Sequence, residues 1–280
     1  MTASTNPFLD ATAQEELYRN ASRLAARTSA LHRAKTWGRA VAEVIADLAT
    51  AHLPAPEVPL VIDVGCGRGT SSRVLAERLR PRRLIGIDAS AAMLDDARAR
   101  LGVTDSAVSF VQADFRHLPV PTGACTVAVA AFCLYHAPRP EAVIAEIARA
   151  LTSGGIAILV TKSADSYHDL DILVADAGLD PDASYRESLY AAAHSGNLAD
   201  LTEPVLPIEH FEHEEHGFTF TNLGHVAEYL ATSPKYQLPA ELRGDPTAIA
   251  SALRTRLPDE PVSTTSVVTY LLARKPGGER

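Results

Sequence analysis

The sequence reads VIDVGCGRGT from Val61 to Thr70, a mostly apolar run followed by three glycines at alternate positions. The run Leu60–Val64 predicts a buried β-strand, and the residues Ser71–Leu79 that follow the loop predict a helix. Glycines between a strand and a helix let the backbone approach a ligand at the carboxyl edge of a parallel sheet. We therefore expect this loop to hold a cofactor.

The spacing of the glycines distinguishes the loop from two common nucleotide-binding loops. Gly65, Gly67 and Gly69 form G-x-G-x-G, with Asp63 two residues before the first glycine. A dinucleotide-binding loop has G-x-G-x-x-G, and a phosphate-binding P-loop ends in Gly-Lys-Ser/Thr. The sequence therefore makes pyrophosphate binding the weaker interpretation and excludes a P-loop.

Strand and helix patterns alternate on both sides of the loop. Further strands are predicted at Leu84–Ile87, Val108–Gln112, Thr126–Ala131, Ile156–Val160, Phe211–Phe220 and Thr264–Ala273. The alternation predicts an α/β fold with a doubly wound, mainly parallel, Rossmann-like sheet of seven strands. It lapses after Lys162, where a mostly helical stretch predicts an insertion after the fifth strand.

The first 55 residues have a helical pattern. Thr12–Glu15 has the form of a capping box and predicts the start of an amphipathic helix that continues through Leu31. A second helical pattern runs from Trp37 to Leu48. We expect an N-terminal helical cap over residues 1–55 and an α/β domain over residues 56–280, with a lid insertion at about 165–207, because connections of this length are often functional.

Charge and composition narrow the kind of partner. The 26 basic and 34 acidic residues give a formal net charge of −8, which disfavours a nucleic-acid substrate. The longest apolar stretch, Val127–Tyr135, is shorter than the roughly 20 residues that span a bilayer. The N-terminus lacks the features of a secretory signal, and Cys66, Cys125 and Cys133 form no C-x-x-C pair. We expect a cytoplasmic protein without a membrane span.

VIDVGCGRGT followed by IGIDASAAML resembles the first two motifs of the class I S-adenosylmethionine-dependent methyltransferases. Further similarity lies in QADF at 112–115, FCLYH at 132–136 and LTSGG at 151–155, so the resemblance covers residues 58–162. It implies S-adenosyl-L-methionine as cofactor, S-adenosyl-L-homocysteine as product and a small-molecule substrate. One departure is Cys125-Thr126, where many relatives begin the fourth strand with Asp.

The resemblance also implies roles for individual residues. Asp88 is expected to bind the ribose hydroxyls, Asp63 the amino end of the methionine part, and Asp114 the adenine amine. The rest of the expected cofactor site comprises Gly65, Cys66, Gly67, Ala89, Met93, Ala113, Phe115 and, from the N-terminal helix, Tyr18. Structural alternatives stay open: Asp88 could cap a helix, Asp63 could brace the loop, and Met93 and Phe115 could pack in the core.

The reaction itself needs aligned reactants more than acid chemistry. His136 is the candidate general base, with Tyr135 beside it at the expected mouth of the site, and lining the pocket is the alternative role. His210, His213 and His216 suggest a metal, but their spacing does not match H-E-x-x-H, and a strand would place them on two faces. We therefore expect no metal.

Three function classes remain open from the sequence. The first is methyl transfer to an oxygen or nitrogen of a small molecule, in the tailoring of a secondary metabolite. The second is a non-methylating cyclisation or elimination by an enzyme that binds the same cofactor. The third is a non-catalytic subunit or ligand sensor. The sequence leaves open whether the chain forms a homo-oligomer or binds another protein.

Overall fold

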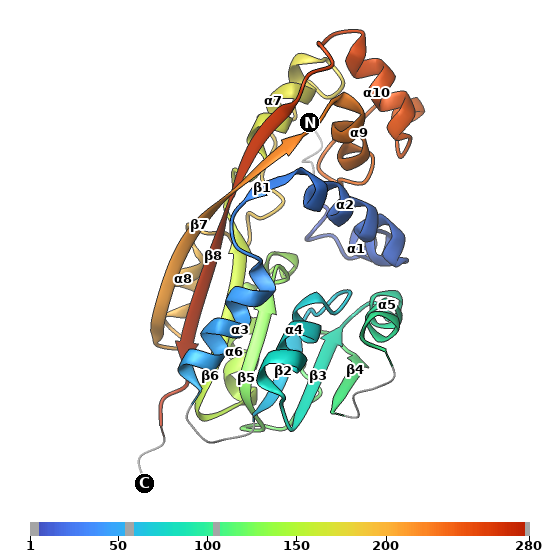
Figure 1. The fold of residues 1–280 in the computed structure, drawn as a ribbon. Helices are drawn as coiled ribbons and strands as arrows, with labels where there is room; N and C mark the ends of the chain where they lie inside the picture. The colour runs from blue at the N-terminus through green and yellow to red at the C-terminus, as the bar shows by residue number, and fades with distance from the viewer. Residues whose placement is uncertain (1–5, 54–58, 103–106, 278–280) are drawn as a thin grey trace. The chain divides into compact units, whose positions relative to one another are not determined.

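The computed structural model describes residues 6–53, 59–102 and 107–277 (Figure 1). The chain divides into two compact units, each built from separate stretches of sequence. Unit 1 contains Met1–Gly38, Ala164–Leu189 and Glu214–Val267, and unit 2 contains Arg39–Ser163, Tyr190–His213 and Val268–Arg280. The expected boundary at residue 55 and the expected insertion at 165–207 do not coincide with this division.

Parallel strands form most of the sheet of unit 2. They are β2 (Leu60–Val64), β3 (Arg83–Asp88), β4 (Val108–Gln112), β5 (Cys125–Ala131) and β6 (Leu151–Lys162), in the spatial order β6-β5-β2-β3-β4. Asp63 of β2 lies opposite Gly86 of β3 and Val129 of β5. Because these strands run in one direction, their carboxyl ends meet at one edge of the sheet, and the predicted Rossmann-like arrangement is confirmed.

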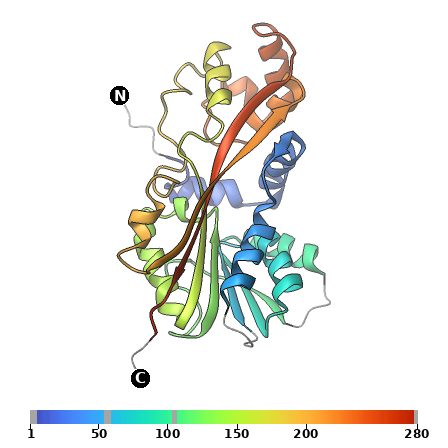
Figure 2. The same ribbon diagram turned by 60° about the vertical axis from the view of Figure 1, so that its left-hand side comes forward.

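Helices cover both faces of the parallel strands (Figure 2). Unit 2 contains α3 (Val41–His52), α4 (Thr70–Leu79), α5 (Ala91–Leu101), α6 (Pro140–Ala150), α8 (Leu198–Thr202) and the short 3-10 helix η1 (Leu134–His136). Ile45 of α3 and Leu75 of α4 are fully buried in one cluster with Val127, Val129 and Ile158 of the sheet. Each such side chain stabilises the unit by about 1.5–3 kcal/mol relative to exposure.

The described part of the chain forms a sheet of eight strands, so the predicted count of seven was wrong. The full order is β1-β7-β8-β6-β5-β2-β3-β4, with β1 (Lys35–Trp37), β7 (Ile208–Phe220) and β8 (Val262–Arg274) added to the parallel set. β8 pairs antiparallel with β6, and β1 pairs antiparallel with β7. A side chain at Gly217 of β7 would come within 1.9 Å of the Trp37 ring, so the glycine makes room for this extra strand.

The N-terminal helical pattern is divided between two helices, α1 (Ala11–Tyr18) and α2 (Ala21–Ala34). Asn20 lies between them and caps α2, because its side chain accepts a hydrogen bond from the Ser22 N–H at 3.2 Å. The predicted capping box was misplaced, since Asp10 caps α1 by accepting from the Ala13 N–H at 2.7 Å.

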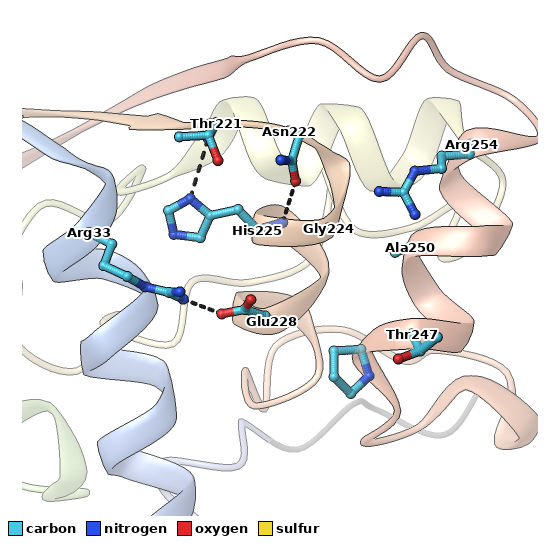
Figure 3. A pocket seen from close by; sticks show the side chains of 10 residues that line it. Arg33, Thr221, Asn222, Gly224, His225, Glu228, Thr247, Ala250 and Arg254 are labelled. Atoms are coloured by element: carbon cyan, nitrogen blue, oxygen red, sulfur yellow. Dashed lines mark hydrogen bonds and ion pairs between the residues drawn. The ribbon is translucent and has the colours of Figure 1, made fainter.

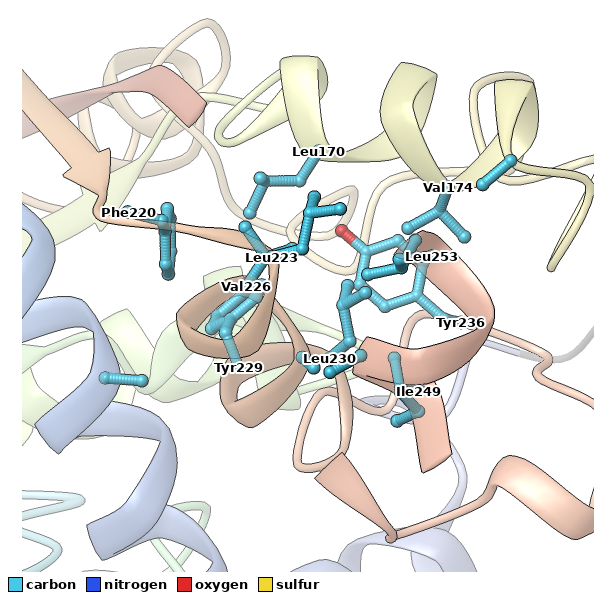
Figure 4. Close-up of a cluster of buried hydrophobic side chains, with 14 of the residues drawn as sticks. Leu170, Val174, Phe220, Leu223, Val226, Tyr229, Leu230, Tyr236, Ile249 and Leu253 are labelled. Carbon is cyan, nitrogen blue, oxygen red and sulfur yellow. The ribbon is translucent and has the colours of Figure 1, made fainter. Parts of the chain in front are cut away.

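Unit 1 has an apolar core of its own (Figure 4). It forms between α2, α7 (His168–Asp176), α9 (Leu223–Leu230) and α10 (Pro246–Arg254), with the 3-10 helix η2 (Ala240–Leu242) at its margin. Leu170, Val226 and Leu253 are fully buried there. The buried carboxylate of Asp171 accepts a hydrogen bond from the Tyr236 hydroxyl at 3.0 Å and pairs with the Lys235 ammonium. This pairing fits the rule that buried charges are retained with partners.

The stretch expected to form one insertion is divided between the units. Its first part, containing α7, belongs to unit 1, and its later part, containing α8, belongs to unit 2. In unit 2 the Thr161 Oγ1 donates to the Ala193 carbonyl at 2.7 Å, and the Ser195 N–H donates to the Lys162 carbonyl at 3.0 Å. These bonds fix residues 193–195 to the end of β6.

Candidate active site

The glycine loop joins β2 to α4 at the carboxyl edge of the parallel sheet. Gly65, Gly67 and Gly69 have φ values of 64°, 52° and 72°, a backbone region that favours glycine. A Cβ at Gly65 would lie 2.5 Å from the Cys133 Cβ, whereas a Cβ at Gly67 would meet nothing within 4 Å. The loop is therefore packed against the residues after β5 at Gly65 and has open space at Gly67.

Asp88, at the end of β3, is hydrogen-bonded to this loop. Its Oδ2 accepts from the Gly67 N–H at 2.9 Å, and its Oδ1 accepts from the Ser90 N–H at 2.9 Å. Ser90 is the residue that caps α5, since its Oγ accepts from the Met93 N–H at 3.3 Å. Burial raises the pKa of Asp88. A carboxylate has room for further donors at both oxygens, so this arrangement suits hydroxyl groups of a ligand beside Gly67.

Asp63 lies on β2, two residues before the loop, and is 1% exposed. Its Oδ2 accepts a hydrogen bond from the Ser72 hydroxyl at 2.6 Å, which joins β2 to the first turn of α4. Burial raises the pKa of Asp63 to about 7, and the nearby charge of Asp88 adds to the rise. The structure shows the contact with Ser72, which braces the glycine loop. Contact of Asp63 with the amino end of a cofactor stays a prediction.

The thiols near the glycine loop are buried and protonated, so their reactivity is low. Cys66 and Cys133 are buried, and burial raises the pKa of both thiols. The Cys133 thiol donates to the Val64 carbonyl at 3.2 Å. Because protonated thiols are poor nucleophiles, these residues pack the loop and are not candidates for covalent catalysis.

The residues expected around adenine follow β4. The Ala113 N–H donates to the Asp88 carbonyl at 3.1 Å, and the Ala89 carbonyl accepts from the Gln112 Nε2 at 2.9 Å. These two bonds connect the segments after β3 and β4. Phe115 is half-buried, but Met93 is 1% exposed and packs in the core. Adenine contact by Met93 therefore stays a prediction, beside the packing role that the structure shows.

Asp114 has a partner, Arg116, that the sequence did not predict. The Arg116 Nε donates to both carboxylate oxygens of Asp114, at 3.0 and 2.9 Å. The Arg116 guanidinium lowers the pKa of Asp114. The carboxylate is thus held ionised in one orientation by a neighbour two positions away, a contact that spacing alone does not predict.

The predicted catalytic residues lie in η1, directly after β5. Tyr135 is buried and His136 half-buried, and their ring centres are 4.8 Å apart. Phe132, which precedes η1, has a φ of 56°, in the left-handed region that costs a non-glycine residue about 1–2 kcal/mol. Its N–H donates to the Val160 carbonyl at 2.8 Å. Since Cys133 packs against Gly65, the segment of the candidate base lies beside the glycine loop.

The departure at the start of the fourth predicted strand has a local explanation. The Thr126 hydroxyl donates to the Leu60 carbonyl at 3.1 Å and accepts from the Leu60 N–H at 3.0 Å. Both residues lie at the amino ends of their strands, β5 and β2. Thr126 thus joins the two strands at the edge opposite the glycine loop.

Other predicted features lie outside this edge of the sheet. Tyr18 is half-buried in α1 of unit 1, and its contact with a cofactor stays a prediction. His210, His213 and His216 lie on β7. Across residues 6–53, 59–102 and 107–277, no group of three or more His, Cys, Asp or Glu side chains is arranged to hold a metal ion. No helix in these same ranges is both long and apolar enough to cross a membrane.

A separate hollow of about 460 Å³ lies within unit 1 (Figure 3). It is lined by Arg33, Thr221, Asn222, Gly224, His225, Glu228, Pro246, Thr247, Ala250 and Arg254. Arg33 pairs with Glu228, and Arg254 pairs with Asp259. His225 is bonded to the Ala30 carbonyl at 2.9 Å and accepts from the Thr221 N–H at 3.3 Å. These pairings account for the polar lining by internal contacts, so we place the candidate active site at the glycine loop.

The glycine loop lies in the part of the chain that is similar to known proteins. Residues 61–155 match a family model described as a methyltransferase domain. A trans-aconitate 2-methyltransferase of Paracidovorax citrulli is 39% identical over 107 residues, which are 38% of this chain and 40% of that relative. The chain therefore spans well under half the length of this curated relative.

Solved structures share the fold at low sequence identity. The protein BH2331 of Bacillus halodurans C-125 has a TM-score of 0.58 and 19% identity, covering 84% of this chain and 99% of that one. The [4+2]-cyclase SpnF has a TM-score of 0.54 and 20% identity, covering 88% of each chain. Identities at this level show the fold alone.

The glycine loop, the acidic residue that ends β3 and the order of the parallel strands fit the arrangement that the resemblance implies. The match to the methyltransferase-domain model confirms, over residues 61–155, the expected resemblance to the class I S-adenosylmethionine-dependent methyltransferases.

Proposed function

We propose that the chain binds S-adenosylmethionine at the glycine loop and transfers its methyl group to an oxygen or nitrogen of a small-molecule acceptor. The observation that carries the proposal is the bond from the Gly67 N–H to Asp88, next to a position where a Cβ would meet nothing within 4 Å. A carboxylate and open backbone at the carboxyl edge of a parallel sheet form a site suited to a nucleoside ribose.

Particular residues fit the parts of the cofactor. Asp88 would accept the ribose hydroxyls, Asp114 the adenine amine beside Phe115, and Asp63 the cationic amino end. When bound, S-adenosylmethionine supplies an electrophilic methyl group on a sulfonium centre. Asp114 suits its role because Arg116 already holds it ionised and oriented. The pairing of Asp63 with a cation is supported by its burial, since an ionised buried carboxylate is costly without a partner.

His136 would act on the acceptor. It lies in the segment that packs beside Gly65, and a histidine near neutral pH can take a proton from a hydroxyl or ammonium group in its reach. Tyr135 packs against its ring and would hold it in place. The main contribution of the site is alignment of acceptor and methyl group, which can lower a barrier by roughly 7–11 kcal/mol.

A small molecule fits the charge of the chain better than a nucleic acid. The net charge of −8 opposes binding to a phosphate backbone. The curated relative is named for trans-aconitate, a small organic acid, which makes trans-aconitate a reasonable acceptor to test. We extend the proposal to a role in tailoring secondary metabolites in the cytoplasm.

Product analysis tests the reaction. The protein is incubated with S-adenosylmethionine carrying a deuterated methyl group and with pools of hydroxyl, amine and carboxylate acceptors, trans-aconitate included. We expect a product that carries the labelled methyl group, together with S-adenosylhomocysteine, and little of either from Asp88→Ala. An acceptor converted to a product of unchanged mass would identify a cyclisation or rearrangement instead. Cofactor binding with no conversion of any pool would contradict methyl transfer to these acceptor classes.

A further inference from the structure

A lysine and aromatic side chains gather at the carboxyl ends of β5 and β6 in unit 2. The Lys162 Nζ lies 5.4 Å from the ring centre of Phe132 and 5.9 Å from that of Tyr190. Tyr190 meets Tyr135 edge-on at 4.9 Å, and Tyr135 lies 4.8 Å from the His136 ring. We call these five residues the Lys162 cluster. They form a continuous series of contacts from an ammonium group to the proposed base.

Backbone hydrogen bonds hold three segments of this cluster together. The Phe132 N–H donates to the Val160 carbonyl at 2.8 Å, which joins the end of β5 to β6. The Ser195 N–H donates to the Lys162 carbonyl at 3.0 Å, and the Thr161 hydroxyl donates to the Ala193 carbonyl at 2.7 Å. The segment that follows Tyr190 is therefore anchored to β6, so the cluster is built by the fold and not by chance contact of surface side chains.

The position and the backbone of the cluster point to a ligand. In open α/β sheets, ligands bind beyond the carboxyl ends of the strands. Phe132 has a φ of 56°, and residues held in such sparsely populated regions concentrate at functional sites. Cys133 next to it packs on Gly65 of the glycine loop. The cluster thus begins beside the proposed cofactor loop and lies at the same edge of the sheet.

We propose that the Lys162 cluster binds the acceptor, and that the acceptor is a hydroxy- or amino-carboxylic acid with a flat, apolar body. The proposal rests on the proposed function. The Lys162 ammonium would bind the carboxylate by charge-assisted hydrogen bonds, and the rings of Tyr190 and Tyr135 would pack on the apolar body. Because Lys162 and His136 lie at opposite ends of the series of contacts, the group that is methylated lies at the end of the acceptor away from its carboxylate.

The single positive charge of the Lys162 cluster favours a carboxylate over a phosphate ester as the anionic group of the acceptor. A phosphate ester is usually bound by several cations or by a bidentate arginine, and Lys162 is the one Lys or Arg among the residues of the cluster. A single carboxylate matches a single ammonium.

In the transfer, the acceptor oxygen or nitrogen bonds to the methyl carbon as the carbon–sulfur bond breaks. The sulfur keeps the bonding electron pair, and His136 takes the acceptor proton.

Matched acid and amide probes test the proposal without relying on turnover. Binding of para-hydroxycinnamate, para-hydroxybenzoate and sorbate, and of their neutral amides, is measured by ligand-detected NMR on the full chain without cofactor. We expect at least one acid to bind the native protein more tightly than its amide. Lys162→Met should weaken binding of that acid by about tenfold or more, since it removes the charged partner of the carboxylate. Binding of the amide should change by no more than about twofold.

Three variants serve as controls. Lys162→Arg keeps the charge and should retain most of the preference for the acid. Tyr190→Ala should weaken acid and amide alike, because it removes packing and not charge. Arg82→Gln removes one positive charge from an exposed residue just before β3, at the opposite edge of the sheet, and should leave acid binding unchanged.

Chemical labelling gives an independent result on the native chain. The sequence has four lysines, Lys35, Lys162, Lys235 and Lys275, so mass spectrometry can follow acylation of each. The bound acid should slow acylation of Lys162 and leave Lys35 unaffected, and the amide should slow neither.

The proposal is wrong if no acid in the panel binds better than its amide, or if Arg82→Gln reduces acid binding as much as Lys162→Met. It is also wrong if Lys162→Met weakens acid and amide equally. Affinity for S-adenosylhomocysteine is measured separately on the same variants. If the native chain fails to bind it but still selects acids through Lys162, the proposed function fails and the acid site stands.

Discussion

Asp88 connects two parts of the site that are far apart in the sequence. Its carboxylate accepts from the backbone of the glycine loop and from Ser90 at the start of the next helix. Neither contact uses all the lone pairs of a carboxylate, so a ligand donor can be added without breaking them. Among the individual residues, Asp88 therefore gives the main support for the cofactor hypothesis.

Asp88→Ala is expected to weaken binding of S-adenosylhomocysteine by about 1.5–3 kcal/mol, the range for hydrogen bonds to a charged group. The measurement is titration calorimetry on folded protein. Asp95→Ala is the matched control, because Asp95 is an exposed carboxylate on α5 that pairs with Arg98. Equal affinity in native protein and Asp88→Ala would mean that the ribose is bound elsewhere.

Asp63 predicts a pH dependence of stability. Burial raises its folded-state pKa to about 7 from a usual 3.8. Between these values the folded state binds more protons than the unfolded state, so the free energy of unfolding falls as pH rises from about 4 to 7. Asp63→Asn keeps an acceptor for the Ser72 hydroxyl but cannot ionise. It should lack this part of the pH dependence and be more stable than native protein above pH 7, by at most about 4 kcal/mol.

Denaturant unfolding at several pH values between about 4 and 8 checks this prediction. The difference between Asp63→Asn and the native chain should widen with pH and then level off. Parallel curves for the two proteins across that range would show that Asp63 does not titrate as the structure indicates.

At the scale of an element, the glycine loop can be tested against a second glycine in a similar conformation. Gly67 and Gly154 both have positive φ, 52° and 78°, and a Cβ at either would meet nothing within 4 Å. Gly154 lies near the amino end of β6, opposite the candidate site. Substitution of either by alanine should cost about 1–2 kcal/mol of stability, from the left-handed backbone alone.

Only Gly67→Ala should also lose affinity for S-adenosylhomocysteine, because its methyl group would enter the open space beside Asp88. Thermal unfolding and calorimetry on both variants separate strain from blocked binding. If Gly154→Ala lost as much affinity as Gly67→Ala, or if neither lost any, the open space at Gly67 would not be the cofactor position.

The sequence predicted the parallel strands of unit 2, because short apolar runs bounded by turn residues are typical of buried strands, and it predicted helices at the positions of α3 and α4. It failed where local signals competed with tertiary contacts. Trp37 fits a helical pattern but lies in β1, since Gly217 leaves space for its ring. The helical periodicity from Leu17 to Leu31 continues across Asn20, whose side chain nevertheless begins a new helix.

In the candidate site too, residues placed by their position in the sequence could be predicted, whereas residues placed by tertiary contacts could not. Asp88 ends β3 and His136 lies shortly after β5, so their place at the carboxyl edge could be predicted from the sequence. Lys162 could have been found in the same way, as the residue that ends the strand before the insertion. Tyr190 could not, because only the bonds from Thr161 and Ser195 bring its segment to β6.

For the whole molecule, the division into two units could not be predicted from the sequence. β7 and β8 each begin in one unit and end in the other, so no change of composition marks the boundary along the chain. The expected cap over residues 1–55 illustrates the difficulty, since α3 belongs to unit 2 and α1 and α2 belong to unit 1.

Hydrogen exchange on the whole chain locates the response to ligand. Addition of S-adenosylhomocysteine should increase protection at residues 63–69, 86–90 and 112–115, where the loop and the following strand ends would be ordered by the ligand. The prediction that Tyr18 contacts the cofactor requires added protection in Ala11–Tyr18 as well. Unchanged exchange there, together with unchanged affinity in Tyr18→Phe, would remove Tyr18 from the site.

The central claim, that the glycine loop binds S-adenosylmethionine, is tested most directly by calorimetric titration of the full chain with S-adenosylhomocysteine. We expect binding at one site with a dissociation constant in roughly the micromolar range, about −8 kcal/mol. Folded protein that gives no heat and no thermal shift with either S-adenosylhomocysteine or S-adenosylmethionine would contradict the claim.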